Sequence, residues 1–497
     1  MGNINAMDNA IDECAGASVS RRDFLGVVGV AGAMGAMSVP VFRASRARAD
    51  EAAPEAGGQA EAAEPAAAGA SVQAGLGVGS LTDEQAMQWL LDEPQVTEDY
   101  VEPDGTVIPA VYVRLRNRVN RIGQGIGSNL VGQDNWEFFK DNWSEEEAEH
   151  WLNMPMFELF TAEDYATMSD LTEQQALELC DELSGRGLLM RVNRGGIEYF
   201  HVIPMAHGLY EFGMGKYNLQ WMTNFAKTLG SDYYATMLDC GSPLYRALPV
   251  SKDVVRDGEL LPYTDWEAMI RRNSIISVSP CQCRLNASIM HGDEPQCDHP
   301  LETCIATGEQ AQYYIENGVG RQITPDEAIE MIKGFVDLGM VPETMYNKSC
   351  DVICNCHGDC CGCLRGIIGI QGQGDAVPNA TFYTLEHDED ACIKCGACAE
   401  RCPLMTITMD EQSGYPVVGP CCVGCGQCVL VCPTSARILA PKDEVPELPS
   451  DFIHADFAKS KVRVEKGYIR DFVGPESVVV PEPAPAAAST DEAPASA

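Results

Sequence analysis

The sequence predicts an α+β protein of several domains. Its 497 residues exceed the usual size of one compact domain, and only three of its 22 cysteines lie before residue 281. Helix signals dominate residues 81–205 and end in two alternating strands, whereas residues 206–375 and 376–442 are rich in cysteine. The folded part is therefore expected to comprise a helical module, a central cysteine-rich domain and a C-terminal cysteine-rich domain.

An export signal is expected at the N-terminus, over residues 1–49. The letters SRRDFL at residues 20–25 have the form of a twin-arginine signal, and Ala47-Arg48-Ala49 has the form of an AxA cleavage site. This pathway carries folded, cofactor-loaded proteins, so the predicted location is periplasmic or otherwise extracytoplasmic. Membrane anchoring by an uncleaved signal is the alternative, because residues 24–42 are marginally long enough to span a bilayer.

Two segments of low complexity flank the folded part. Residues 50–80 are predicted to be a disordered linker, because Ala, Glu, Gly and Pro leave almost no large apolar side chain to bury. Residues 443–497 are expected to be an extension that ends in a disordered tail of the same composition. The formal net charge of -39 disfavours nucleic acid and anionic lipid as partners. It favours a basic redox partner protein, either soluble or membrane-bound, and it also serves solubility.

The helical module, residues 81–205, is predicted from capping signals and apolar spacing. Gly185 and Gly187 are expected to end the last helix. Strands are then expected over residues 188–192 and 197–202. Three pairs have the spacing of a capping box, namely Thr82 with Gln85, Ser144 with Glu147, and Thr172 with Gln175.

From about residue 144 the order helix, helix, helix, hairpin resembles a winged helix-turn-helix. The resemblance implies that the third helix would enter the major groove of DNA. That helix carries four carboxylates that would face phosphates, at Glu173, Glu178, Asp181 and Glu182. We therefore predict no binding to nucleic acid, and a structural or partner-docking role for this winged-helix-like module.

Near the C-terminus, four cysteines in the spacing CxxCxxCxxxCP occur twice, 30 residues apart. Three thiolates on one tight loop and a fourth from elsewhere provide the all-sulfur coordination of a [4Fe-4S] cluster. Apolar segments at residues 382–385, 407–409, 416–418 and 437–439 predict small hairpins around helices that start near each Cys-Pro pair. The two runs are Cys392, Cys395, Cys398 and Cys402, and Cys422, Cys425, Cys428 and Cys432.

Over about residues 380–440 this spacing resembles that of the bacterial two-cluster ferredoxins. The resemblance implies a C-terminal dicluster ferredoxin fold in which the fourth cysteine of each run binds the other cluster. A pair of zinc ribbons is the alternative, although zinc sites rarely repeat a third cysteine at the same interval before a Cys-Pro pair. The implied ligand sets are Cys392, Cys395, Cys398 and Cys432 for one cluster, and Cys422, Cys425, Cys428 and Cys402 for the other.

The central domain is expected to be a helical metal domain. A helix is predicted near residues 309–316, and Thr324 caps another that has Pro325 in its first turn. Two cysteine-bearing loops would meet over this helical pair. Free thiols at such density would oxidise after export, and adjacent or one-apart cysteines form disulfides poorly but bind metals well. The expected metal ligands are Cys281, Cys283, Cys297, Cys304, Cys354, Cys356, Cys360 and Cys361.

One or two additional iron-sulfur clusters are the predicted occupants of this domain, with zinc and structural disulfides as the alternatives. His299 and His357 are candidate ligands of a mixed site, although each is expected to lie beside the metal or at the surface. The segments PCQCR, CDHPLETC and ICNCHGDCCG resemble a family of bacterial ferredoxin-like proteins over about residues 145–440. In that family a winged-helix segment, a cysteine-rich domain and a dicluster ferredoxin follow in this order. His357 stands where a cysteine is common in the family.

These features predict an exported iron-sulfur electron-transfer protein, as a carrier or an oxidoreductase subunit rather than a self-sufficient enzyme. No GxGxxG follows a predicted strand and no CxxCH occurs, so no flavin or haem of its own is expected. Two alternatives remain. One is an oxidoreductase that reduces a small molecule at the central site, and the other is a cluster-based redox sensor or docking protein.

Overall fold

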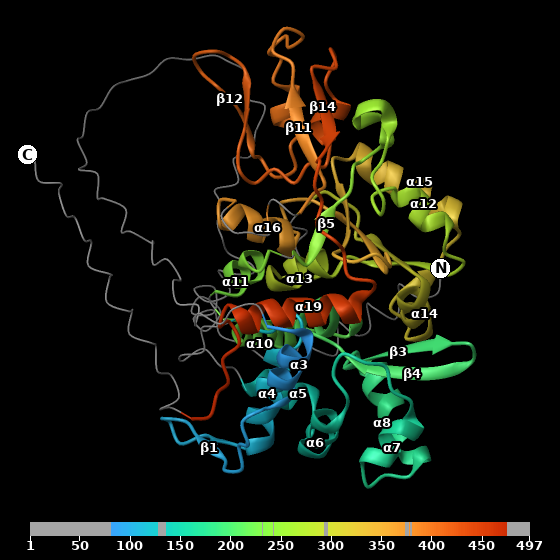
Figure 1. The fold of residues 1–497 in the computed structure, drawn as a ribbon, viewed down its shortest axis with the longest axis vertical. Helices are drawn as coiled ribbons and strands as arrows, with labels where there is room; N and C mark the ends of the chain where they lie inside the picture. The colour runs from blue at the N-terminus through green and yellow to red at the C-terminus, as the bar shows by residue number, and fades with distance from the viewer. Residues whose placement is uncertain are drawn as a thin grey trace, which may run out of the picture.

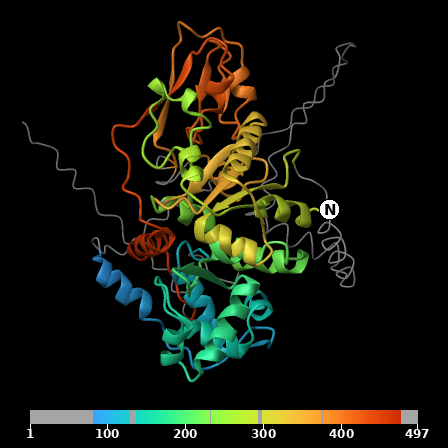
Figure 2. The same ribbon diagram turned by 90° about the vertical axis from the view of Figure 1, so that its right-hand side faces the viewer.

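The computed structural model describes residues 81–127, 136–230, 232–241, 243–292, 297–372, 377 and 380–474. The predicted signal peptide, linker and disordered tail lie outside the described residues. Along the longest axis the helical module lies at one end, the central sheet in the middle and the hairpins of the C-terminal segment at the other end (Figures 1 and 2). The fold is mixed helix and sheet, as the sequence predicts.

Short capped helices build the N-terminal part. All three predicted capping boxes form, and a fourth joins Thr161 to Asp164. Each box satisfies backbone N–H groups at the start of its helix that have no partner within the helix. The small ribbon of β1 and β2, over Tyr100–Val101 and Val107–Ile108, precedes α4. The helices are α3 (Asp83–Leu91), α4 (Ala110–Arg121), α5 (Trp136–Asn142), α6 (Glu145–Asn153), α7 (Ala162–Met168) and α8 (Glu173–Arg186).

The predicted hairpin follows α8. Gly187 ends that helix in the left-handed conformation, at a φ of 84°, which a side chain would disfavour. Strands β3 (Leu189–Arg194) and β4 (Ile197–Val202) then pair antiparallel, and Phe160 forms a bridge with Phe200 of β4. The order helix, helix, helix, hairpin therefore occurs over Glu145–Val202.

A six-stranded antiparallel sheet forms the centre, in the order β5-β9-β10-β7-β6-β8. The expectation of a helical central domain missed this sheet. Its strands are short, and in β7 and β10 cysteines obscure the alternation of apolar and polar residues. They are β5 (Tyr245–Ala247), β6 (Ile276–Pro280), β7 (Glu302–Thr307), β8 (Arg321–Gln322), β9 (Val341–Met345) and β10 (Val352–Cys356).

The two faces of this sheet have different neighbours. Ile305 of β7 and Ile353 of β10 belong to one apolar cluster with the buried faces of α12 (Trp266–Arg271) and α15 (Pro325–Asp337). Thr324 caps α15 as predicted. Ala306 and Val352, one residue away on the same strands, belong to the apolar cluster of the helical module. Successive side chains of a strand point to opposite faces, so one face meets α12 and α15 and the other meets the N-terminal helices.

Further helices surround this second face of the sheet. Helix α14 contacts both β6 and the hairpin strand β3. Helix α10 contacts α13, and α11 contacts α16. Their bounds are η2 (Met205–Leu209), α9 (Tyr210–Phe212), α10 (Leu219–Thr228), α11 (Tyr233–Asp239), α13 (Gln282–Met290), α14 (Gly308–Glu316) and α16 (Gly362–Gly369). Two short helices, η3 (Lys252–Val254) and η4 (Arg256–Gly258), contact the C-terminal segment instead.

The C-terminal segment consists of two antiparallel ribbons and two short helices. The ribbons pair β11 with β14 and β12 with β13, at the predicted positions. Helices α17 and α18 were expected to start near the Cys-Pro pairs, but they end before these pairs. The residue before a proline disfavours helical geometry. The bounds are β11 (Tyr383–His387), α17 (Ala397–Glu400), β12 (Ile407–Met409), β13 (Pro416–Val418), α18 (Gln427–Leu430) and β14 (Arg437–Pro441).

The last described helix, α19 (Phe452–Glu465), returns to the N-terminal end and packs on α3 (Figure 1). Arg463 of α19 is fully buried and donates hydrogen bonds to the carbonyl and side-chain oxygens of Asn120 at 2.7 and 2.9 Å. One apolar cluster extends from Leu90 to Phe472 and crosses the boundary expected near residue 205. Among the described residues, no helix is long and apolar enough to span a membrane.

Candidate functional site

The eight cysteines of the two C-terminal runs fall into two groups of four in space. Each group lines one small cavity, and in each the fourth cysteine of one run lies with the first three of the other. We call these cavities group 1 and group 2. Group 1 is Cys392, Cys395, Cys398 and Cys432, and group 2 is Cys402, Cys422, Cys425 and Cys428.

Left-handed glycines shape both cavities. Gly396 and Gly426 have φ angles of 79° and 86° and stand immediately before α17 and α18. A side chain at Gly426 would lie 2.5 Å from Val254 Cγ2, so the chain approaches η3 closely there. These turns bring backbone N–H groups to the rim of each cavity, where they can donate to sulfur.

Burial differs between the two groups. Cys395 of group 1 is exposed, whereas Cys425 and Cys428 of group 2 are buried. Burial raises the pKa of Cys428 to about 12, and the nearby Arg437 guanidinium opposes this shift. Burial also raises the pKa of Cys398, again with opposition from Arg437. This buried cation lies close to both groups and compensates negative charge on their thiolates.

In the central domain, β-sheet register brings three thiols together. Ala306 pairs with Val352 and Ile305 pairs with Ile353 across β7 and β10, so the next position places Cys304 opposite Cys354. Side chains alternate along a strand, so Cys354 and Cys356 point to the same face. That face is the one turned toward the helical module.

Two CxC motifs add thiols from helix N-termini. Cys281 caps α13 and Cys283 lies in its first turn, and Cys361 and Cys363 hold the same positions on α16. The N–H of Leu364 donates to Cys361 Sγ at 3.5 Å. The N-terminus of a helix carries partial positive charge, which stabilises thiolates there.

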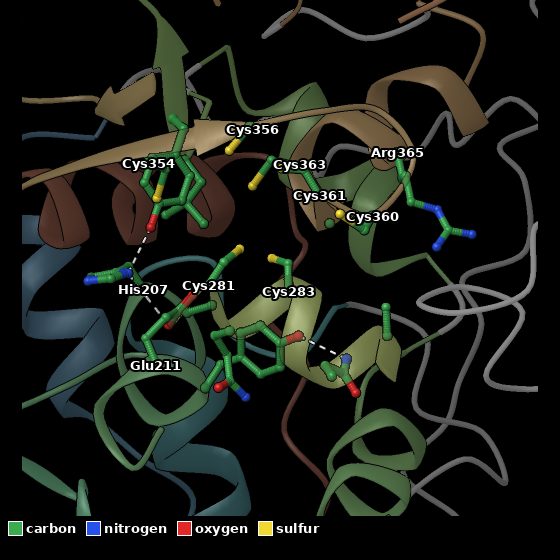
Figure 3. Close-up of a pocket in the computed structure, with 18 of the residues that line it drawn as sticks. His207, Glu211, Cys281, Cys283, Cys354, Cys356, Cys360, Cys361, Cys363 and Arg365 are labelled. Atoms are coloured by element: carbon green, nitrogen blue, oxygen red, sulfur yellow. Dashed lines mark hydrogen bonds and ion pairs between the residues drawn. The ribbon is translucent and has the colours of Figure 1, made fainter. Parts of the chain in front are cut away.

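These elements enclose one central cavity, which we call the thiol cavity (Figure 3). The sulfur atoms of Cys281 and Cys283 point across it toward Cys354, Cys356 and Cys363 (Figure 3). The cysteines that line the cavity are Cys281, Cys283, Cys304, Cys354, Cys356, Cys360, Cys361 and Cys363.

Crowding sets the protonation of these thiols. Contact with Cys283 and then burial raise the pKa of Cys281 well above that of a free thiol. Contacts with Cys304 and Cys356 lower the pKa of Cys354 well below it, against the effect of burial. Closely packed thiols in a dry site cannot all ionise together, because like charges repel. A bound cationic metal core would allow them to do so, so this donor set fits an iron-sulfur cluster.

Proton-binding groups lie beside the thiols in the lining of this cavity. His207 Nδ1 lies 2.7 Å from the Tyr245 hydroxyl and 3.6 Å from a Glu211 carboxylate oxygen. Burial lowers the pKa of His207, but the Glu211 carboxylate outweighs this and the net shift is upward. Glu343 lies 3.8 Å from Cys361 Sγ, and burial raises its pKa to about 7.

Most of the cysteines that line the thiol cavity were predicted from the sequence as metal ligands. Of the predicted central ligands, Cys297 does not line the thiol cavity but lies 3.5 Å from Cys360, sulfur to sulfur. Cys363 was not among the expected ligands, although its CxC spacing before a helix matches that of Cys281 and Cys283. No sequence motif indicates that His207 and Glu343 line the cavity. Cys350 packs in the cluster of α12 and α15, away from the cavity.

The thiol cavity and group 2 are linked by short backbone contacts. The N–H of Gly358, two residues after Cys356, donates to the carbonyl of Pro403, the residue after Cys402, at 3.1 Å. The N–H of Val250 donates to the Cys425 carbonyl at 2.9 Å. Group 2 is therefore the C-terminal group that adjoins the central domain.

Comparison with known proteins agrees with this geometry. A family model described as a 4Fe-4S binding domain matches residues 385–408, which contain the first cysteine run. No curated protein and no solved structure matches the chain. The chain thus contains a ferredoxin-type iron-sulfur domain near its C-terminus, and its function in general terms is iron-sulfur electron transfer.

The contact at Gly358 yields a stability prediction. In Gly358→Ala the new Cβ would lie 2.3 Å from the Pro403 carbonyl oxygen, so the central loop and the C-terminal segment must separate. We expect a loss of about 1–3 kcal/mol in the free energy of unfolding, measured by denaturant titration of anaerobic protein. The matched control is Gly334→Ala in α15, where nothing lies within 4 Å of the new Cβ. It should be stabilising by up to about 1 kcal/mol. Equal stability of the two variants would contradict the contact.

Proposed function

We propose that this chain is an exported electron-transfer protein in which groups 1 and 2 each bind a [4Fe-4S] cluster. The observation that carries the proposal is that each group brings four thiols to one small cavity. Four thiolates are the ligand set that such a cluster requires, and the bound cluster would supply one-electron redox chemistry. The left-handed glycines and Arg437 fit the same role, because they offer donors and positive charge to sulfur.

The exposure of the cysteines suggests the order of the sites along the proposed electron path. Cys395 of group 1 is exposed and Ile393 beside it is 62% exposed, so a redox partner protein would exchange electrons there. Group 2 has two buried cysteines, Cys425 and Cys428, and adjoins the central domain through Gly358 and Pro403. The net charge of -39 favours a partner with a basic docking face. Electrons would pass from the partner through group 1 and group 2 to the centre, or in reverse.

The thiol cavity is proposed to hold at least one further iron-sulfur cluster. Cysteines from β7, β10 and the N-termini of α13 and α16 converge on it, which is more thiol than one cubane needs. The helix N-termini and the divergent thiol pKa values favour an occupant that binds several thiolates at once. Structural disulfides are disfavoured, because cysteines one residue apart pair poorly.

The winged-helix-like module is proposed to be structural, with no role in binding nucleic acid. Arg191 and Arg194 of the hairpin, the cations that phosphates would need, form ion pairs with Glu316 and Glu309 of α14. The Tyr313 hydroxyl of α14 also donates to the Ser184 carbonyl of α8 at 2.6 Å. The hairpin and the third helix are thus engaged by the central domain.

The two-cluster assignment is tested with Cys395→Ser. Loss of one thiolate from group 1 should abolish or convert one cluster, so the spin-coupled electron paramagnetic resonance signal of two reduced clusters should become that of one. The matched control is Cys421→Ser, because Cys421 lies beside group 2 but donates to the Ile367 carbonyl and belongs to neither cavity. It should keep both signals. A wild-type protein that contains only zinc at these cysteines would overturn the assignment.

Export is tested in the precursor, independently of the metal content. Replacement of Arg21 and Arg22 by Lys should leave unprocessed protein in the cytoplasm, because this pathway requires the twin arginines. The control replaces Arg46 and Arg48 by Lys, which keeps the signal pair and the net charge. Normal secretion of the Arg21, Arg22 variant would show that the N-terminal segment has another role.

A second candidate function is reduction of a small molecule in the thiol cavity. The observation that favours it is the buried His207, which contacts Tyr245 and Glu211 in the lining of the thiol cavity. Such a group can hold a proton next to a site that gains an electron. A pure electron carrier does not need a buried group that holds a proton beside its cluster.

Proton coupling separates the two functions. If His207 exchanges a proton with the central site, the midpoint potential of that site should fall by about 59 mV per pH unit in the wild type and should become nearly pH-independent in His207→Gln. The control is His454→Gln, since His454 is on the exposed side of α19 and 68% of its side chain is accessible. Identical pH profiles in all three proteins would eliminate the reductase and leave the carrier.

A further inference from the structure

We propose that Cys297, His299, Asp359 and Cys360 form a mononuclear site for a divalent metal, of the kind that zinc occupies, beside the thiol cavity. This site goes beyond the proposed electron transfer and does not depend on a cluster in the cavity. Sulfur, nitrogen and oxygen atoms of Cys297, His299 and Asp359 all lie within 4.8 Å of one another. Cys360 adds a second sulfur.

The cysteine pair has the spacing of two ligands of one ion. Cys297 Sγ and Cys360 Sγ are 3.5 Å apart. A disulfide would require about 2.05 Å. Two zinc-sulfur bonds of about 2.3 Å at a tetrahedral angle place the sulfur atoms about 3.8 Å apart. The observed separation is therefore near that of two thiolates on one tetrahedral ion.

Histidine and carboxylate complete the donor set. His299 Nδ1 lies 3.3 Å from one oxygen of Asp359, and His357 Nδ1 lies 3.1 Å from the other. The two imidazole rings are 4.4 Å apart and face the same carboxylate. We assign Asp359 and His299 as ligands and His357 as a positioning residue that holds Asp359 through its second oxygen.

Charge supports an ion at this place. Two thiolates and a carboxylate would gather three negative charges, and Arg284 is the buried cation near both thiols. The guanidinium is held by the Pro300 carbonyl and the Thr303 hydroxyl, each at 2.7 Å. One positive charge leaves the cluster anionic, whereas a divalent ion brings the formal sum to zero.

The donor set also differs from that of the thiol cavity, with which the site shares only Cys360 among its proposed ligands. Cys297 does not line the cavity, and a mixed set of sulfur, nitrogen and oxygen suits zinc rather than a cubane cluster. The two cysteines are 63 residues apart and join the segment before β7 to the loop after β10. A metal there would close this long loop and stabilise the central sheet.

The test is metal content per chain in the full-length protein, purified without oxygen. The wild type should contain one zinc besides its iron. The double variant Cys297→Ser, His299→Ala should lose that zinc and keep its iron and sulfide. The control His454→Ala changes an exposed histidine of α19, outside the donor set and the thiol cavity, and should keep both metals. Loss of iron instead of zinc in the double variant would overturn the proposal, because Cys297 would then be a cluster ligand.

A spectroscopic measurement on the wild type keeps the test valid if the double variant does not fold. Co²⁺ exchanged into the protein should give the intense visible bands of a tetrahedral ion and a sulfur-to-cobalt charge-transfer band. Both should weaken in His357→Ala, which leaves every proposed ligand in place. A wild-type protein that binds neither zinc nor Co²⁺ outside its iron sites would refute the site.

Discussion

The register between β7 and β10 is the constraint on which the central site depends. Because Ile305 pairs with Ile353, these two side chains face α12 and α15, and Cys304 and Cys354 come together on the opposite face. A slip of one residue would turn these thiols into the apolar layer. The N-termini of α13 and α16 then complete a ring of thiols around one cavity, with their partial positive charge directed at sulfur.

The proposed redox sites lie where the parts of the fold contact one another. The apolar cluster that begins at Leu90 continues through the central sheet to α19, so the helical module and the centre are not independent bodies. The C-terminal segment joins them through peptide contacts at Gly358 and Val250, next to cysteines of group 2 and the thiol cavity. The contacts that would carry electrons between sites are thus the ones that hold the parts together.

Much of the periphery was predictable from sequence, because local rules determine it. The capping boxes at Thr82, Ser144 and Thr172 formed, and the C-terminal ribbons lie where the apolar segments predicted them. The central sheet was missed because its strands are short and because cysteines at inward positions of β7 and β10 hide the alternation of those two strands. His207 and Glu343 reach the thiol cavity through tertiary packing alone, and no local pattern indicates such residues. The proximity of Cys297 to Cys360 also comes from the fold, across 63 residues.

The proposed cluster in the thiol cavity would add iron and sulfide to those that groups 1 and 2 bind. The most direct test is a count of iron and acid-labile sulfide per chain in anaerobically purified protein, with clusters fully reconstituted. Two cubane clusters account for about eight of each. With a further cluster in the thiol cavity, each count should be clearly more than eight per chain, and close to about twelve if that cluster is one cubane. A count that saturates at eight, with the central cysteines free to alkylation in the folded protein, would contradict it.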